Sequence, residues 1–290
     1  MKTQPNGDIS PLAEKAAIKT ARHASEGGHW YDFDCNQVLE VPSADGKRLV
    51  KATLTHARKL DLAPGVTTIT GQIDKPAVTL WRCRQAIMAA LTLPRRDSET
   101  EKEWLDRVEE DMDSHSRSAA EEGTRIHAAV QSHVQGEPFD QNYRQHVDGI
   151  MAKLPTDGGK WFSEVTVVSR LGYGTKIDLV NDNYLLDFKS KDGSQEELDE
   201  LVTYEEHAQQ LQAGLAALVD GTKPPPHGLS ANWERTLGIV FVSRTHPGAC
   251  SVRMVGEQEL ETGWETFELL LRLWQKRRRH VPFVNRIHPF

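Results

Sequence analysis

The chain is 290 residues long, with 38% hydrophobic residues, 27% charged residues and a formal net charge of −7. This length suffices for one large domain, or for a catalytic domain with an N-terminal addition. No apolar run approaches the roughly 20 residues that a membrane-spanning helix needs, and residues 1–10 lack the apolar stretch of a secretory signal. Three widely spaced cysteines indicate free thiols in a reducing compartment and exclude a four-cysteine iron–sulfur cluster formed by this chain alone. We therefore expect a cytoplasmic protein without a membrane partner.

The acidic balance of 42 carboxylates to 35 cations argues against tight non-specific binding to nucleic acid, because simple DNA-binding domains are usually basic. It does not exclude a local phosphate track, which needs only a stripe of lysines and arginines. Two basic clusters offer such a stripe, at residues 276–280 and at Arg95 and Arg96. The first would also stabilise a helix C-terminus, so its presence has a structural explanation as well.

The first 63 residues are predicted to be an addition to a domain that covers residues 64–290. Within the addition, residues 11–24 have the pattern of a short helix, and residues 30–41 and 49–54 that of strands. Residues 64–69 then lead to Pro76, which suits the first turn of a helix that ends before Pro94.

The remaining elements are predicted from periodicity and turn residues. Helical spacing covers residues 97–135, in one or two pieces, and residues 141–154. Three strands follow at 161–169, 173–180 and 184–189, then a helix at 195–219, strands at 237–242 and 250–255, and a last helix at 257–279. This order predicts an α/β (mixed α+β) fold with a central mixed β-sheet flanked by helices.

The two strands at 173–180 and 184–189 carry the most informative charges. A two-residue loop at Asp182 and Asn183 would form a hairpin in which Asp178 lies opposite Asp187, whereas a three-residue loop would offset the pair. Alternation then places Lys189 beside Asp187, and Lys176 and Val180 beside Asp178. Ile177, Leu179, Tyr184, Leu186 and Phe188 would share the opposite, apolar face.

Two facing carboxylates are destabilising unless a cation lies between them. Mg²⁺ or Mn²⁺ would suit the position, because both accept carboxylate oxygens. Lys189 could then stabilise charge that develops on a phosphate or assist an attacking water. The alternative is an exposed hairpin face with ordinary charges.

Asp178, followed by Asp187, Phe188 and Lys189 after a short turn, resembles the core of the PD-(D/E)XK nucleases. The segment 123–127 (Gly-Thr-Arg-Ile-His) on a predicted helix is similar to the RecB-like branch, of the type found in phages and prophages. The resemblance implies a restriction-endonuclease-like core and a metal bound by His127, Asp178, Asp187 and the backbone carbonyl of Phe188. Without this context, His127 would be interpreted as an ordinary core or surface histidine.

Two further site residues depend on the same resemblance. Glu164 lies on the preceding strand, where RecB-like proteins often have a glutamate, so it is either an auxiliary metal residue or an edge carboxylate without a role. Gln210 matches the glutamine of the family's Gln-x-x-x-Tyr motif, which organises the site or contacts DNA, although the tyrosine position is Gly214 here. The glutamines of this segment are equally consistent with a solvated helix face.

The resemblance implies a Mg²⁺- or Mn²⁺-dependent deoxyribonuclease, more consistent with an exonuclease than with an endonuclease, in bacterial or phage recombination, repair or DNA processing. Its partners would be linear duplex or single-stranded DNA ends, and a single-strand annealing or recombination protein. No P-loop or dinucleotide fingerprint occurs, so no nucleotide cofactor is expected. The alternative is a catalytically weak or inactive nuclease-fold protein that binds nucleic acid or a partner protein, which the net charge and Gly214 favour.

Overall fold

A five-stranded sheet forms the centre of the molecule in the computed structural model, which describes residues 29–43 and 45–287. The strand order is β10-β9-β8-β7-β6. The strands are β6 (Phe162–Ser169), β7 (Tyr173–Val180), β8 (Tyr184–Lys191), β9 (Thr236–Ser243) and β10 (Cys250–Met254). Only β8 and β9 are parallel within this sheet. Because parallel neighbours need a crossover, the chain leaves β8 through two helices before it returns as β9.

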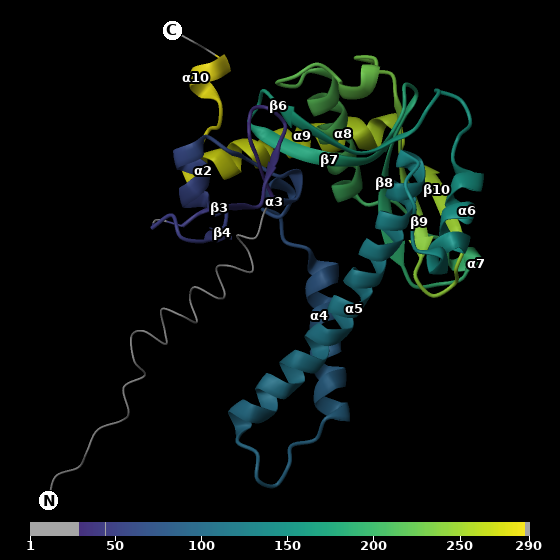
Figure 1. Ribbon diagram of the computed structural model, residues 1–290. Helices are drawn as coiled ribbons and strands as arrows, with labels where there is room; N and C mark the ends of the chain where they lie inside the picture. The colour runs from purple at the N-terminus through teal and green to yellow at the C-terminus, as the bar shows by residue number, and fades with distance from the viewer. Residues whose placement is uncertain (1–28, 44, 288–290) are drawn as a thin grey trace, which may run out of the picture.

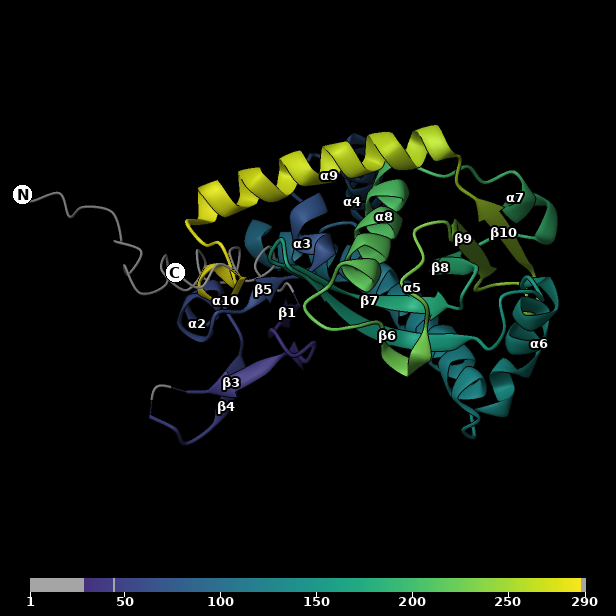
Figure 2. The same cartoon turned by 90° about the horizontal axis from the view of Figure 1, so that it is seen from above.

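Helices cover both faces of the sheet (Figure 2). On one face, α8 (Glu205–Val219) and α9 (Glu257–Arg278) bury the larger apolar cluster, which includes Phe241, Phe267 and Trp274. On the other face, the second half of α5 (Glu101–Gln135) and α6 (Arg144–Lys153), which follows the short helix η1 (Gln141–Tyr143), bury a second cluster. This arrangement confirms the predicted mixed α/β fold with a central mixed sheet flanked by helices.

The described part of the N-terminal segment contains more turns than predicted. Residues 30–41 form β1 (Trp30–Tyr31), β2 (Gln37–Val38) and β3 (Glu40–Pro42) instead of one strand. The Asp32 side chain accepts hydrogen bonds from the backbone N–H groups of Asp34 and Asn36, which folds the chain back between β1 and β2. The helix predicted at residues 11–24 lies outside the described residues, and the division at residue 63 stays a prediction.

The strand predicted at residues 49–54 is also wrong in its second half. β4 covers Leu49–Lys51, and the helix α2 (Leu54–Leu60) begins directly after it. At its N-cap, the backbone N–H of Thr53 donates to Nδ1 of His56 at 3.2 Å. The short elements β5 (Ala63–Pro64) and α3 (Val66–Thr70) follow, and Trp30, Ala57 and Val66 all join the larger cluster.

The helix predicted over residues 195–219 is interrupted. The structure has α7 (Gln195–Asp199) and α8, with non-helical residues between them. Each piece has its own N-terminal cap, because Ser194 and Glu197 form a capping box, and the backbone N–H of Tyr204 donates to Nδ1 of His207 at 3.1 Å. The short helices η2 (Pro226–Gly228) and α10 (Val284–Ile287) complete the described elements.

A helical hairpin projects from the body (Figure 1). It consists of α4 (Pro76–Thr92) and the first part of α5, which is one continuous helix of 35 residues. The two helices lie side by side, and Trp104 of α5 donates its indole N–H to the carbonyl of Leu93 at 2.7 Å. Within the described residues, no helix combines the length and the apolar character that crossing a membrane requires.

Candidate metal centre

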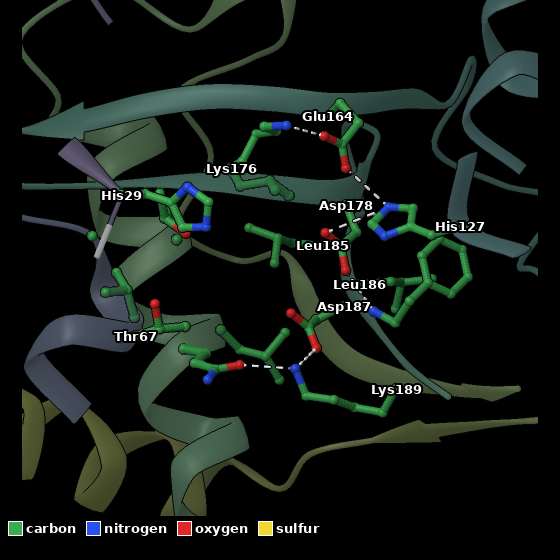
Figure 3. Close-up of a pocket in the computed structure, with 18 of the residues that line it drawn as sticks. His29, Thr67, His127, Glu164, Lys176, Asp178, Leu185, Leu186, Asp187 and Lys189 are labelled. Carbon is green, nitrogen blue, oxygen red and sulfur yellow. Dashed lines mark hydrogen bonds and ion pairs between the residues drawn. The ribbon is translucent and has the colours of Figure 1, made fainter. Parts of the chain in front are cut away.

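A cavity of about 410 Å³ lies beside the strands β6, β7 and β8. The strands contribute Glu164, Asp178, Asp187 and Lys189, while α5 contributes His127. Figure 3 shows these side chains around one space, with His29 and Thr67 on the opposite wall. A cavity of this size is typical of a ligand-binding site.

The hairpin of β7 and β8 has the predicted two-residue loop. The backbone N–H of Asn181 donates to the carbonyl of Tyr184 at 3.0 Å, and Leu179 pairs with Leu186. In this register Asp178 and Asp187 would form the next pair after Leu179 and Leu186. The hydrogen-bonded ladder ends before that pair. Asp178 Oδ2 instead accepts a hydrogen bond from the backbone N–H of Phe188 at 2.8 Å. The strands therefore separate where the charged groups lie.

The face predicted for Ile177 is wrong. Leu179 and Leu186 belong to the cluster under α5, whereas Ile177 belongs to the cluster under α8, together with Val180. Strict alternation would put Ile177 and Leu179 on one face. The alternation breaks beside Glu164, whose φ of 56° lies in the left-handed region that is rare for residues other than glycine. This distortion lies at the charged site, a place where backbone strain often accompanies function.

His127, Glu164 and Asp178 form the tightest group of the site. Each offers one ligand atom, and these atoms all lie within 4.8 Å of one another. His127 Nε2 lies 2.9 Å from Glu164 Oε1 and 3.7 Å from Asp178 Oδ1. Glu164 is also paired with Lys176. Glu164 lies on the edge strand β6, and its side chain is next to the other two residues.

Burial and mutual charge set the protonation of this group. Burial, assisted by the neighbouring Asp187 carboxylate, raises the pKa of Asp178 to about 7. Burial alone would also raise the pKa of Glu164, but its contacts with His127 and Lys176 lower it to about 2. Burial alone would lower the pKa of His127, yet the carboxylates of Glu164 and Asp178 outweigh burial and raise it. Within one group, the pKa of Asp178 is therefore raised while that of Glu164 is lowered.

Lys189 lies at the other side of Asp187, held by two partners. Its Nζ is 2.5 Å from Asp187 Oδ2 and donates to Gln210 Oε1 at 2.9 Å. Burial alone would lower the pKa of Lys189, but Asp187 outweighs burial and raises it, so the ammonium stays charged. Gln210 donates in turn to Glu206 at 3.3 Å. The predicted glutamine is thus a partner of the lysine, and its helix faces the cavity instead of solvent.

The residues present fit a divalent cation. His127 Nε2 lies 2.9 Å from Glu164 Oε1 and Asp187 Oδ2 lies 2.5 Å from Lys189 Nζ, so the nitrogen and oxygen donors of the site face one another across a short distance. One imidazole with several carboxylates is a donor set that suits Mn²⁺ and, through its oxygens, Mg²⁺. Asp187 lies outside the group formed by His127, Glu164 and Asp178. The role of Asp187 and of the Phe188 carbonyl as metal ligands stays a prediction.

Several residues of the site were not predicted from the sequence. Glu206 accepts a hydrogen bond from Gln210 and forms an ion pair with Lys75 at 2.5 Å. Its position four residues before Gln210 on one helix was the feature of the sequence that could have predicted the contact with Gln210. His29 and Thr67 also line the cavity. Their place in the site depends on the packing of β1 and α3 against the sheet.

No protein-family model matches this chain, and a search among curated proteins finds no significant match.

Proposed function

We propose that this protein is a Mg²⁺- or Mn²⁺-dependent deoxyribonuclease of the PD-(D/E)XK, RecB-like type, acting on DNA ends. The observation that carries the proposal is the convergence of His127, Glu164 and Asp178 within 4.8 Å, with Asp187 and Lys189 on the adjacent strand β8. A supporting observation is the lysine held beside Asp187.

His127, Glu164 and Asp178 would hold the cation, with Asp187 on the side that faces Lys189. A divalent cation bound there supplies a Lewis acid and lowers the pKa of water, which is the chemistry that phosphodiester hydrolysis needs. The residues are well suited to hold it, because Glu164 and Asp178 lie on paired strands and His127 on a helix packed against them. Rigid elements of this kind maintain ligand geometry better than loops.

Lys189 contributes a fixed positive charge beside the reacting phosphate. Its ammonium has three N–H donors, of which Asp187 and Gln210 orient two. The remaining donor can hydrogen-bond an attacking water or a phosphoryl oxygen whose charge increases in the transition state. Preorganised donors of this kind typically contribute 10²–10³ in rate. Gln210 is a positioning residue in this scheme, because it acts through Lys189.

The β1 and α3 segments contribute His29 and Thr67 to the wall opposite His127 and Lys189 (Figure 3). A space of about 410 Å³ accommodates a group of about nucleotide size. The preference for DNA ends follows from the resemblance of the site residues to the RecB-like branch.

End-labelled linear duplex, closed circular and single-stranded DNA, each incubated with Mg²⁺, Mn²⁺ or EDTA, test the proposal. We expect metal-dependent loss of linear DNA and survival of closed circles, with no loss in the Asp187→Ala variant. Cleavage of closed circles would contradict the exonuclease assignment. Binding of DNA without cleavage in every metal would contradict the nuclease and favour the alternative, a nuclease-fold protein that only binds nucleic acid.

A further inference from the structure

Exposed cations gather where the helices α2 and α9 end. The last turn of α9 lies beside α2 (Figure 1), and Arg58 of α2 donates from Nη2 to the backbone carbonyl of Arg278. The exposed cations of this surface, which we call the basic ridge, are Arg58, Lys59, Lys276, Arg277 and Arg279. The chain as a whole has a net charge of −7, so the ridge is a local reversal of the overall charge balance.

The basic ridge lacks counter-charges within the described part of the chain. None of its cations forms an ion pair with a described residue, whereas several arginines elsewhere pair with carboxylates. Asp61, directly after α2, accepts a hydrogen bond from the backbone N–H of Phe283 at 3.0 Å and lies 4.0 Å from Arg286. No other carboxylate occurs in residues 46–73 or 269–287. The positive charge of the ridge is therefore free to attract an anionic partner.

The helix dipole explains only part of the ridge. Cations in the last turn of a helix are stabilised by its dipole, and both α2 and α9 have cations there. That explanation treats each helix by itself. With the two helix ends side by side, the like charges of both share one surface and repel one another. A polyanion bound along the ridge would offset this repulsion.

Helix α3 connects the ridge to the metal centre. On one side, Arg277 Nη1 donates to Oε1 of Gln72, two residues beyond the end of α3, at 3.3 Å. On the other side, Thr67 of α3 lines the cavity of the metal centre. The end of the ridge at Arg277 is thus separated from the cavity by about one helix diameter, roughly 10–12 Å. A molecule that occupies the cavity and extends past α3 would meet the ridge.

We propose that the basic ridge binds the phosphate backbone of a DNA duplex whose end lies in the cavity. This inference rests on the proposed function, because it identifies the surface that holds the rest of the substrate. A duplex advances about 3.4 Å per base pair, so the ridge contacts phosphates from about 3–4 base pairs inward of the end. Phosphate contacts carry no sequence information. The ridge therefore holds any duplex and lets it slide as its end is shortened.

The salt dependence of duplex binding tests the proposal without relying on cleavage. The assay is the fluorescence anisotropy of a labelled duplex with the full chain in EDTA, between 50 and 200 mM salt. Removal of two phosphate contacts in Lys59→Ala/Lys276→Ala should make the loss of affinity over this range about 12-fold smaller than in the unmodified protein. Binding at 50 mM salt should also be weaker. Both lysines are exposed, so the melting temperature should not change.

The matched control removes the same charge elsewhere. Lys102→Ala/Lys153→Ala changes two exposed lysines, on α5 and α6, and should keep the salt dependence of the unmodified protein. Equal salt dependence of the ridge variant and the unmodified protein, or equal changes in both variants, would overturn the proposal. So would an unmodified protein that does not bind duplex DNA. Absence of cleavage in Mn²⁺ would contradict the nuclease assignment and leave this binding test intact.

Cross-linking locates the contact on the duplex. The photoreactive residue p-benzoylphenylalanine in place of Lys276 should cross-link to an end-labelled duplex about 3–4 base pairs or more from its end. The same residue in place of Lys153 should not cross-link. No cross-link from position 276, cross-links confined to the terminal base pair, or equal cross-linking from both positions would contradict the proposed path of the DNA.

Discussion

Asp178→Asn should have opposite effects on stability without and with metal. Without metal, the buried Asp178 carboxylate lies close to Asp187, and the two negative charges repel. An asparagine removes one of these charges, while its side-chain oxygen can still accept the hydrogen bond from the Phe188 N–H. The variant should therefore be more stable than the unmodified protein in EDTA, although it loses a metal ligand.

The magnitude follows from the pKa of Asp178. The pKa of Asp178 is about 7 in the folded chain, against an ordinary value of 3.8. Between these two pH values the Asp178 carboxyl group keeps its proton in the native state and has lost it in the unfolded state. The free energy of unfolding therefore falls as pH rises through this window. This pKa difference lowers the free energy of unfolding at pH 8 by at most about 4 kcal/mol. Relaxation of the side chains reduces the loss to roughly 1–3 kcal/mol.

Thermal unfolding in EDTA at pH 5 and pH 8, followed by addition of Mn²⁺, measures these effects. At pH 8 the variant should melt several degrees above the unmodified protein, since about 1 kcal/mol shifts the melting temperature by roughly 2–4 °C in chains somewhat shorter than this one. At pH 5 the gain should shrink, and Mn²⁺ should stabilise only the unmodified protein. Asp148→Asn, at an exposed carboxylate on α6, is the control and should change stability little. A variant less stable than the unmodified protein in EDTA at pH 8 would refute the reasoning.

Four further variants test the same site and its support. Glu164→Gln should weaken Mn²⁺ binding about 10–100-fold in calorimetry, and unchanged affinity would show that Glu164 is not a ligand. Gln210→Leu removes the 2.9 Å hydrogen bond to Lys189 and should lower kcat about tenfold or more with unchanged Mn²⁺ affinity, whereas a loss of Mn²⁺ affinity would contradict its role as a positioning residue. Gly214→Ala should stabilise the chain by about 0.5–1 kcal/mol, because an added Cβ would lie an ordinary 3.6 Å from Ile177. Gly174→Ala, whose Cβ would lie 2.5 Å from the Tyr31 ring, should destabilise it in the same denaturant titration.

The sequence was most informative where local rules determine the structure. Strand alternation and the Asp182-Asn183 loop were enough to predict the hairpin and the neighbourhood of Asp178, Asp187 and Lys189, because turn chemistry and side-chain period are local properties. The capping residues Thr53 and His56 were also visible in the sequence, but the β-branched residues around them favoured a strand.

The rest of the site depends on contacts between distant segments. The contact of Glu164 with His127 joins residues on a strand and on a helix, and no spacing rule connects them. The break in alternation beside Glu164 requires a left-handed backbone at a glutamate, which residue type alone would not suggest. His29 reaches the cavity only because β1 packs on β5 and next to β7.

Cleavage of end-labelled linear duplex DNA in Mn²⁺ by the unmodified protein and by Lys189→Ala, with Mn²⁺ affinity measured on both, tests the central claim most directly. The account predicts that the unmodified protein releases label only when Mn²⁺ is present. It predicts that Lys189→Ala still binds Mn²⁺ but cleaves at least 10²-fold more slowly. Equal cleavage by both proteins, or no cleavage by the unmodified protein despite bound Mn²⁺, would contradict it.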